Sequence, residues 1–192
     1  IKNLRFSDDD IKYLKSLGTF KDEFLNYLKT FKFNGEIYAV EEGNIVFPHE
    51  PLLRVKANIM EAQLIETAIL NILNFQTLIA TKSSRICKAA NNDLVMEFGL
   101  RRAQGRSAGI YGAKAAVIGG CGGTANVLAA KMFDIKPLGT HSHSWIQSFD
   151  NEIDAFRAYA KMYPNAALLL VDTYDTLKSG IPNAIKVFKE LR

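Results

Sequence analysis

Two histidines at alternate positions are the first candidates for chemistry. His141 and His143 lie in the stretch Gly-Thr-His-Ser-His-Ser, residues 139–144, and in extended backbone they would point the same way. The turn's backbone N–H groups and the hydroxyls of Thr140 and Ser144 suit a bound phosphate or carboxylate. A histidine there could act as an acid or base, or as a nucleophile toward phosphorus. Two alternatives remain open: loop histidines with local hydrogen bonds, and a metal pair without an obvious third ligand.

A carboxylate at the end of an apolar stretch is the second candidate. Asp172 directly follows Leu-Leu-Leu-Val at residues 168–171. A carboxylate there is costly unless it is paired, binds a cation or faces a wet cleft, so we favour a functional role for Asp172. Asp175 suits a functional role and the capping of the next helix equally well.

Two adjacent arginines form the third candidate. Arg101 and Arg102 follow Glu97, Phe98 and a glycine. Neighbouring side chains cannot both point into one site. We therefore expect one to bind a carboxylate or phosphate and the other to be structural, paired for example with Glu97. Phe98 could stack on an aromatic ring or fill a core. The glycine-rich turn at 119–124 lacks the Lys-Ser/Thr of a phosphate-binding Walker loop, and close strand–helix packing explains it equally well.

These residues follow strands in an alternating series of strands and helices. The expected strands lie at 94–98, around 123, around 137 and at 167–172. The expected helices lie at 61–90 (with a possible break at 81–83), 107–118, 126–133, 152–162 and 177–191. A spacing of roughly 30 residues is that of a βα unit and indicates a parallel α/β fold. An open doubly wound sheet and a β/α barrel both fit. Polar groups after three strands favour the barrel, here an incomplete one with about half of its eight strands.

The first 57 residues have a different pattern. Ser7 should cap a helix starting at about Asp9, and Thr19 should cap a second helix. Strands are expected at 35–40, 44–47 and 52–57, the first two forming a hairpin around Glu42-Gly43. We therefore expect part of a smaller α+β domain at 1–57 and the first part of an α/β barrel catalytic domain at 58–192.

Composition narrows the class of protein. The net charge is +4 with Lys and Arg dispersed along the chain, which predicts no nucleic-acid partner. Cys87 and Cys121 have neither metal-site nor disulfide-framework spacing. We expect free thiols in a reducing, cytoplasmic compartment. The apolar stretch 64–80 is interrupted by Glu66, Asn71, Asn74 and Gln76, so no membrane span is expected. Both ends of the chain fall beside helices, and we expect it to be an internal piece of a longer protein.

Five segments, in order, resemble nicotinate phosphoribosyltransferases over nearly the whole chain. They are Pro-His-Glu-Pro-Leu-Leu-Arg-Val (48–55), Glu-Phe-Gly-Leu-Arg-Arg-Ala-Gln-Gly (97–105), Gly-Thr-Ala-Asn-Val-Leu-Ala (123–129), Gly-Thr-His-Ser-His-Ser-Trp (139–145) and Leu-Val-Asp-Thr-Tyr-Asp-Thr (170–176). Each motif is modestly specific, whereas all five in this order are highly specific.

The resemblance implies a type II phosphoribosyltransferase fold, an irregular α/β barrel with a second domain. It implies formation of nicotinate mononucleotide and pyrophosphate from nicotinate and phosphoribosyl pyrophosphate, in NAD biosynthesis by salvage. It also implies Mg²⁺, ATP hydrolysis coupled through a phosphohistidine at His143, and a homodimer with shared active sites. Arg101 would lie near the nicotinate or the phosphate. Asp172 would lie near the ribose and the metal-bound pyrophosphate. The other substrate-binding residues expected are Phe98, Thr140, Ser144 and Asp175.

The chain also departs from the family pattern. It lacks the family's N-terminal Thr-Asp-x-Tyr stretch and the second half of the barrel, so we expect this piece alone to be inactive. The nearest rival is a nicotinamide enzyme, which in this comparison has an Asp where Ala125-Asn126 stands here. A quinolinate enzyme would need more basic residues. A non-catalytic domain of the same fold, and a metal hydrolase using His141, His143 and Asp172, are further alternatives.

Overall fold

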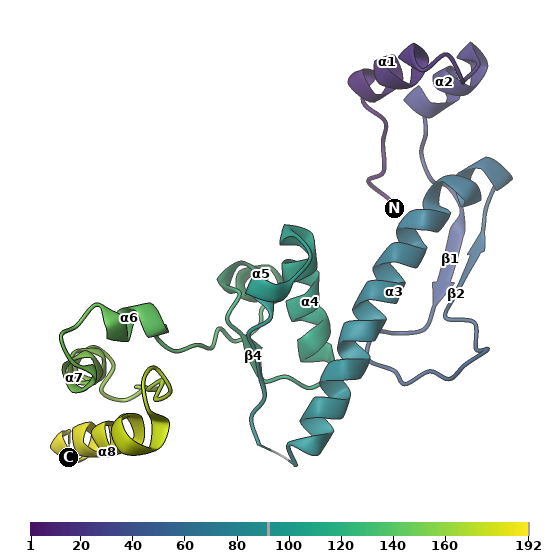
Figure 1. Cartoon of the computed structure of the whole chain (residues 1–192). Coiled ribbons are helices and arrows are strands. Elements are labelled where there is room, and N and C mark those ends of the chain that lie inside the picture. The colour runs from purple at the N-terminus through teal and green to yellow at the C-terminus, as the bar shows by residue number, and fades with distance from the viewer. Residues whose placement is uncertain (92, 192) are drawn as a thin grey trace. The chain divides into compact units, whose positions relative to one another are not determined.

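A computed structural model describes residues 1–91 and 93–191 of the chain (Figure 1). The chain divides into two compact units, Ile1–Lys82 and Ser83–Arg192. This division falls inside one long helix, α3, whereas the sequence suggests a domain boundary between residues 57 and 58. The boundary of the functional domains stays a prediction.

The first unit begins with two short helices. Ser7 caps α1 (Asp8–Ser16): its hydroxyl accepts from the Asp10 N–H, and the Asp10 carboxylate accepts from the Ser7 N–H at 2.7 Å. The predicted Thr19 cap is wrong, because α2 (Asp22–Lys29) begins after Lys21 without a side-chain cap. The helices pack through a small core of Ile11, Leu25 and Leu28.

Two strands of the first unit form an antiparallel pair. β1 (Glu36–Ala39) pairs with β2 (Leu53–Lys56), with Glu36 opposite Lys56. The predicted hairpin with a strand at 44–47 is wrong. Ile45 and Phe47 are 85% and 66% exposed, so this alternating stretch has no covered face to pack on. Strand propensity reflects such packing more than an intrinsic backbone preference.

A single helix, α3 (Ile59–Ala89), follows without the break expected at 81–83. By length and composition alone it could cross a membrane, with a mean hydropathy of 1.3 over an 18-residue window. Core helices of water-soluble proteins pass the same test, so this is weak support for a membrane segment. The absence of a membrane partner stays a prediction.

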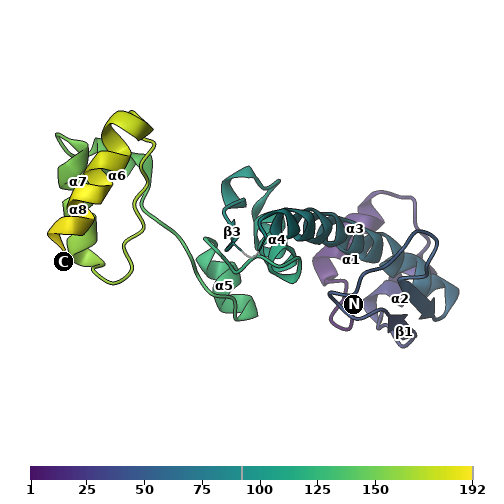
Figure 2. The same cartoon turned by 90° about the horizontal axis from the view of Figure 1, so that it is seen from below.

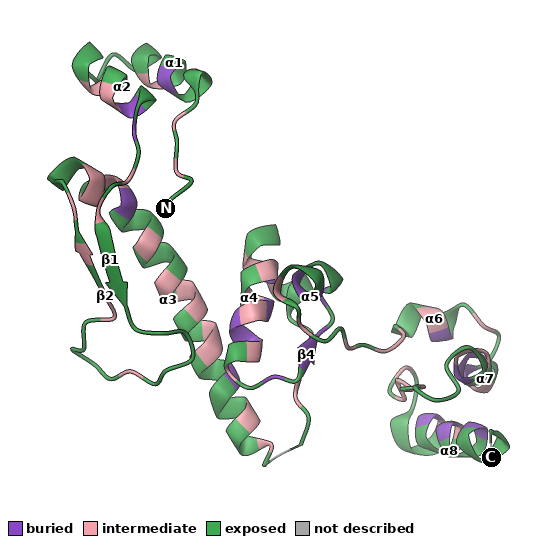
Figure 3. Ribbon diagram, turned by 180° about the vertical axis from the view of Figure 1, so that it is seen from behind, coloured by how far each residue is buried: buried purple, intermediate pink, exposed green. Residues whose placement is uncertain are grey.

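The second unit contains the parallel part of the fold. β3 (Met96–Glu97) pairs in parallel with β4 (Gly123–Thr124), and Thr124 forms a further parallel bridge with Pro137. The intervening elements are the 3₁₀ turn η1 (Leu100–Arg102) and the helices α4 (Arg106–Ile118) and α5 (Val127–Phe133). Figure 3 shows buried residues along α4 and β4. Parallel segments joined by helices confirm a partial α/β fold.

The last predicted strand, at 167–172, is wrong: in the described chain this segment forms no backbone ladder. It is tied to the preceding segment by side chains instead. The Thr140 hydroxyl donates to the Leu168 carbonyl, and the Leu170 N–H donates to His141 Nε2 at 3.1 Å. Side-chain acceptors and donors here satisfy backbone groups that a strand partner would otherwise satisfy.

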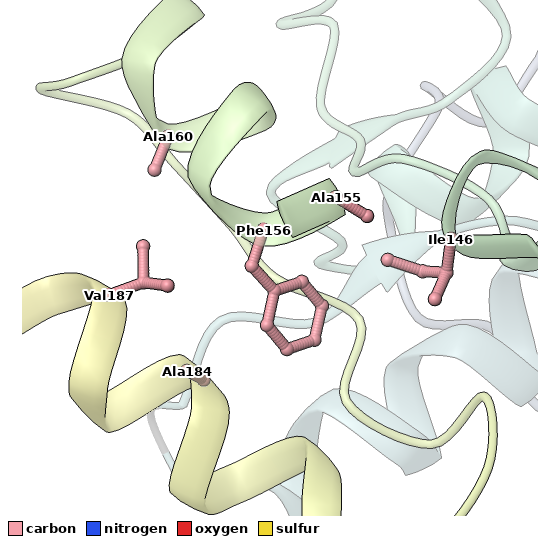
Figure 4. Packing of buried hydrophobic residues seen from close by; sticks show 6 residues of the cluster. All are labelled: Ile146, Ala155, Phe156, Ala160, Ala184 and Val187. Carbon is pink, nitrogen blue, oxygen red and sulfur yellow. The ribbon is translucent and has the colours of Figure 1, made fainter. Parts of the chain in front are cut away.

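Three helices complete the second unit and lie side by side in Figures 1 and 2. They are α6 (His143–Gln147), α7 (Glu152–Met162) and α8 (Ile181–Glu190), with the wide π turn η2 (Thr176–Gly180) before α8. Their core holds Ile146, Ala155, Phe156, Ala160, Ala184 and Val187 (Figure 4). This packed core positions the two segments that carry His143 and Asp172.

Candidate functional site

His143 and Asp172, separated by almost thirty residues in the chain, lie next to each other. His143 is the first residue of α6, a helix that the sequence did not predict. Its Nε2 lies 4.0 Å from Asp172 Oδ1, and its Nδ1 hydrogen-bonds with Thr173 Oγ1 at 3.2 Å. Both side chains are about half exposed, at 49% and 59%. The site is therefore open to a ligand and already holds the imidazole in one orientation.

The side chains of His141 and His143 make contacts with different groups, whereas in extended backbone they were expected to point the same way. The His141 Nε2 atom accepts from the Leu170 N–H, so Nδ1 carries the proton and can donate to the Ser142 carbonyl at 3.4 Å. The ring also meets Tyr159 edge-to-face, with centroids 4.7 Å apart. Burial lowers the pKa of His141, and the nearby His143 acts in the same direction, whereas the Ser142 contact opposes them. His141 is therefore a neutral structural group at pH 7.

The backbone before Asp172 is held by a glycine contact. A Cβ built on Gly180, in η2, would lie 1.8 Å from the Val171 carbonyl oxygen. Only glycine therefore permits this approach. Asp175 accepts from the N–H groups of Leu177 and Lys178 at 3.1 and 2.9 Å. This is the capping role that the sequence left open, and its role in substrate binding stays a prediction.

A cavity of about 400 Å³ opens beside these segments. Aromatic rings dominate its lining, which consists of His141, Ser142, Trp145, Tyr159, Met162 and Tyr163. The Ser142 hydroxyl hydrogen-bonds with the Ser144 hydroxyl at 2.7 Å. Thr140 is committed to the Leu168 carbonyl, so of the two predicted hydroxyls Ser144 is the more available for a ligand.

The arginine segment forms a second group of predicted residues. The expected pairing of an arginine with Glu97 is wrong. The Glu97 carboxylate accepts from the Gly99 N–H and from the Thr124 hydroxyl. Arg101 and Phe98 are both exposed, Phe98 by 44%. Within residues 1–91 and 93–191 no hydrogen bond or ion pair joins Arg101 to His143 or Asp172, so their convergence on one pocket stays a prediction.

Sequence reasoning missed three groups that position the pair. Thr173 could have been suspected, because its hydroxyl follows Asp172 directly in the sequence. The sequence gives no role to His141, because its acceptor function depends on the distant Leu170 N–H. No local signal marks Gly180, because the need for glycine there comes from a tertiary approach to Val171.

The described residues contain no group of three or more His, Cys, Asp or Glu side chains that could hold a metal ion. Asp172 could still contribute one carboxylate. Mg²⁺ is commonly bound through one or two carboxylates together with substrate phosphates and water.

Parallel strands joined by helices, with a histidine at the start of α6 beside a carboxylate on the segment that follows α7, define part of an α/β domain. Two family descriptions match the chain. Residues 1–74 match the nicotinate phosphoribosyltransferase (NAPRTase) N-terminal domain, and residues 94–183 match the nicotinate phosphoribosyltransferase (NAPRTase) family. The chain belongs to the nicotinate phosphoribosyltransferase family, as its motifs predicted.

Individual relatives agree with this assignment. The chain is 44% identical over 191 residues to nicotinate phosphoribosyltransferase pncB2 of Mycobacterium tuberculosis, covering 100% of this chain and 41% of the relative. It is 47% identical to nicotinate phosphoribosyltransferase of Bacillus subtilis, covering 99% and 39%. The crystal structure of human nicotinic acid phosphoribosyltransferase superimposes with a TM-score of 0.86 at 27% identity, covering 97% of this chain and 48% of that one. The chain thus spans about two fifths of the length of these curated relatives.

Proposed function

We propose that the full-length protein containing this chain is a nicotinate phosphoribosyltransferase. It would transfer the phosphoribosyl group of phosphoribosyl pyrophosphate to nicotinate, giving nicotinate mononucleotide and pyrophosphate for NAD biosynthesis. The observation that carries the proposal is the placement of His143 between Asp172 and Thr173, within motifs shared in order with this family. Relatives at 44% and 47% identity carry this name.

Asp172 is the group that we assign to the transition state. Loss of pyrophosphate builds positive charge on the anomeric carbon of the ribose, and a carboxylate close to that carbon stabilises the charge. The Asp172 side chain is 59% exposed, so it can face a bound substrate. Bound Mg²⁺ would neutralise charge on the leaving pyrophosphate, and Asp172 is the described carboxylate we assign to hold it.

His143 is the group that we assign to ATP coupling. The Thr173 hydroxyl holds one ring nitrogen, so the ring is oriented before any phosphate arrives. A phosphoryl group adds about −1.5 to −2 charges, if phosphohistidine resembles other phosphorylated residues. With Asp172 only 4.0 Å from the ring, the added phosphoryl group would repel the carboxylate. Phosphorylation would thus reorder the site, and hydrolysis after turnover would reverse the change and help product leave.

Arg101 and Phe98 are the groups that we assign to the nicotinate ring and its carboxylate. Arg101 is exposed, and the Glu97 carboxylate is already taken by Gly99 and Thr124. An arginine fork matches a carboxylate in a bidentate way, and an exposed phenyl face suits an aromatic ring. The proposal includes a cytoplasmic homodimer with shared active sites and inactivity of residues 1–192 on their own.

The full-length protein with His143→Asn tests the coupling step. Incubation with γ-labelled ATP should give acid-labile label on the wild type and none on the variant. Steady-state turnover should show ATP hydrolysis tied to nicotinate mononucleotide formation in the wild type alone. A His143→Asn protein that still coupled the two reactions would refute the assignment of His143. Absence of any phosphoribosyl transfer by the wild type would refute the proposed enzyme activity itself.

A further inference from the structure

Two thiols that are far apart in the sequence lie close together in the second unit. Cys87 is on the last turns of α3, and Cys121 is in the turn between α4 and β4. They are separated by 34 positions, yet their Sγ atoms are 3.9 Å apart. Neither belongs to the site that contains His143 and Asp172.

The approach of the two thiols is built into the backbone. Gly120 has a φ of +109°, and a Cβ there would lie 3.3 Å from Cys87 Cβ and 3.4 Å from its Sγ. The turn is anchored on both sides of Cys121, because the Cys121 N–H donates to the Ala116 carbonyl and the Gly122 N–H to the Val95 carbonyl. The short distance therefore follows from fixed backbone on each side.

We propose that Cys87 and Cys121 form a reversible disulfide when the protein meets a peroxide. A disulfide bond is about 2.05 Å long, so the sulfurs must approach by about 2 Å. In the first step the Cys87 sulfur takes one oxygen atom from the peroxide, giving a sulfenic acid and water. In the second step the Cys121 sulfur attacks the Cys87 sulfur, the S–O bond breaks, and the hydroxyl group leaves as water with the Cys121 proton.

The exposure of the two cysteines indicates which of them the peroxide oxidises first. Cys121 is 8% exposed, whereas Cys87 is only partly buried and can meet a small oxidant. Burial and the contact with Cys87 raise the pKa of Cys121 to about 11. Cys121 is therefore a poor first nucleophile at neutral pH, since the thiolate is the reactive form. A hydrogen bond with Ser83 opposes the shift, and it would stabilise the Cys121 thiolate during its attack.

The disulfide would close a loop that contains β3, η1 and α4. This loop includes Phe98 and Arg101, the residues assigned above to nicotinate. The inference does not rest on the proposed activity, because it concerns only the two sulfurs and the backbone around them. A cross-link of this loop length constrains the unfolded chain, and it is expected to raise Tm by several degrees, on the order of 5 °C.

The test uses the full-length protein, reduced, freed of reductant and treated with hydrogen peroxide at neutral pH. Remaining thiols are alkylated, and peptides are mapped by mass spectrometry. We expect a linked peptide joining Cys87 to Cys121 that has lost two hydrogens and that dithiothreitol separates again. The oxidised protein should melt several degrees higher than the reduced one. The rate of linkage should rise with pH between pH 7 and 9, as the Cys121 thiolate fraction rises.

Cys87→Ser is the first control, because this partly exposed position tolerates a hydroxyl, and it should abolish both the linkage and the change in Tm. Cys121→Ala is the second, and it should leave a sulfenic acid on Cys87 that a dimedone probe traps. Two results would overturn the inference. One is recovery of both cysteines as alkylated thiols after peroxide treatment. The other is oxidation of Cys87 to a sulfinic acid with Cys121 still free.

Discussion

Replacing Gly180 by alanine should disable the site without touching any group that contacts substrate. The new Cβ would lie 1.8 Å from the Val171 carbonyl oxygen, and real Cβ contacts essentially never fall below 3.0 Å. The backbone of Val171 or of η2 must therefore move by at least about 1.2 Å, the difference between these two distances. Asp172 is the next residue, so the carboxylate would leave its position 4.0 Å from His143.

A displacement of about 1 Å at a reacting group can cost about 100-fold in rate. Overpacking of this kind costs about 1–3 kcal/mol of stability. We therefore expect Gly180→Ala in the full-length enzyme to lower kcat/KM for phosphoribosyl pyrophosphate by about 100-fold and to lower Tm by a few degrees. Activity is compared at a temperature where both proteins are folded.

Two comparisons isolate the cause. Gly139→Ala is a matched stability control, because a Cβ there meets no atom within 4 Å, and its Tm should stay close to that of the wild type. The double variant Gly180→Ala with Asp172→Asn should be no slower than Asp172→Asn, since both changes act through one carboxylate. Two results would refute this reasoning. One is a double variant whose loss in kcat/KM is the product of the two single losses. The other is a Gly180→Ala enzyme whose kcat/KM lies within twofold of the wild-type value.

Three further predictions concern other positions. His141→Ala should cost about 2 kcal/mol in the free energy of unfolding, from one hydrogen bond with Leu170 and one aromatic contact, measured by urea denaturation. Because folding lowers the pKa of His141, its contribution is fully present above the unfolded value of about 6.5 and is lost as pH falls through the folded value. His141→Gln should lack this dependence. Glu152→Ala should lower the free energy of unfolding by at least about 2 kcal/mol, because this buried carboxylate accepts from Ser179 at 2.5 Å and Asn183 at 3.0 Å. An unchanged midpoint of urea denaturation would contradict this. Arg101→Lys should lower kcat/KM for nicotinate about tenfold or more, while any activity toward nicotinamide should change little. Equal losses for both substrates would contradict a carboxylate contact.

Helices were largely predictable because their signals are local. Ser7 marks the start of α1 through its reciprocal bonds with Asp10, and Asn126 and Asn151 likewise accept from N–H groups at the starts of α5 and α7. Strand positions were predicted less completely, because a strand needs a partner elsewhere in the chain: β1 to β4 lie within or at expected strands, whereas 44–47 and 167–172 form none. The stretch 44–47 alternates correctly but has no partner, and β1 pairs instead with β2.

The reactive groups of the candidate site could be predicted from the sequence, whereas the residues that position them could not. His143 and Asp172 were found from residue type and motif, which are properties of single positions. The contacts of His141 with Leu170 and of Gly180 with Val171 exist only because two distant segments meet. The same holds for the pair Cys87 and Cys121, whose spacing of 34 positions matches no short motif.

The way the Asp172 segment is held has a consequence for the proposed coupling. A strand inside a sheet is fixed by a ladder of neutral backbone bonds, which a charge nearby changes little. The segment before Asp172 is fixed by two side-chain bonds, from Thr140 and to His141, and by the Gly180 contact. Within the described residues, a shift of this carboxylate would break no backbone ladder. Negative charge added to His143, 4.0 Å away, would therefore be able to displace the Asp172 carboxylate. An electrostatic switch between two site geometries requires such a displacement.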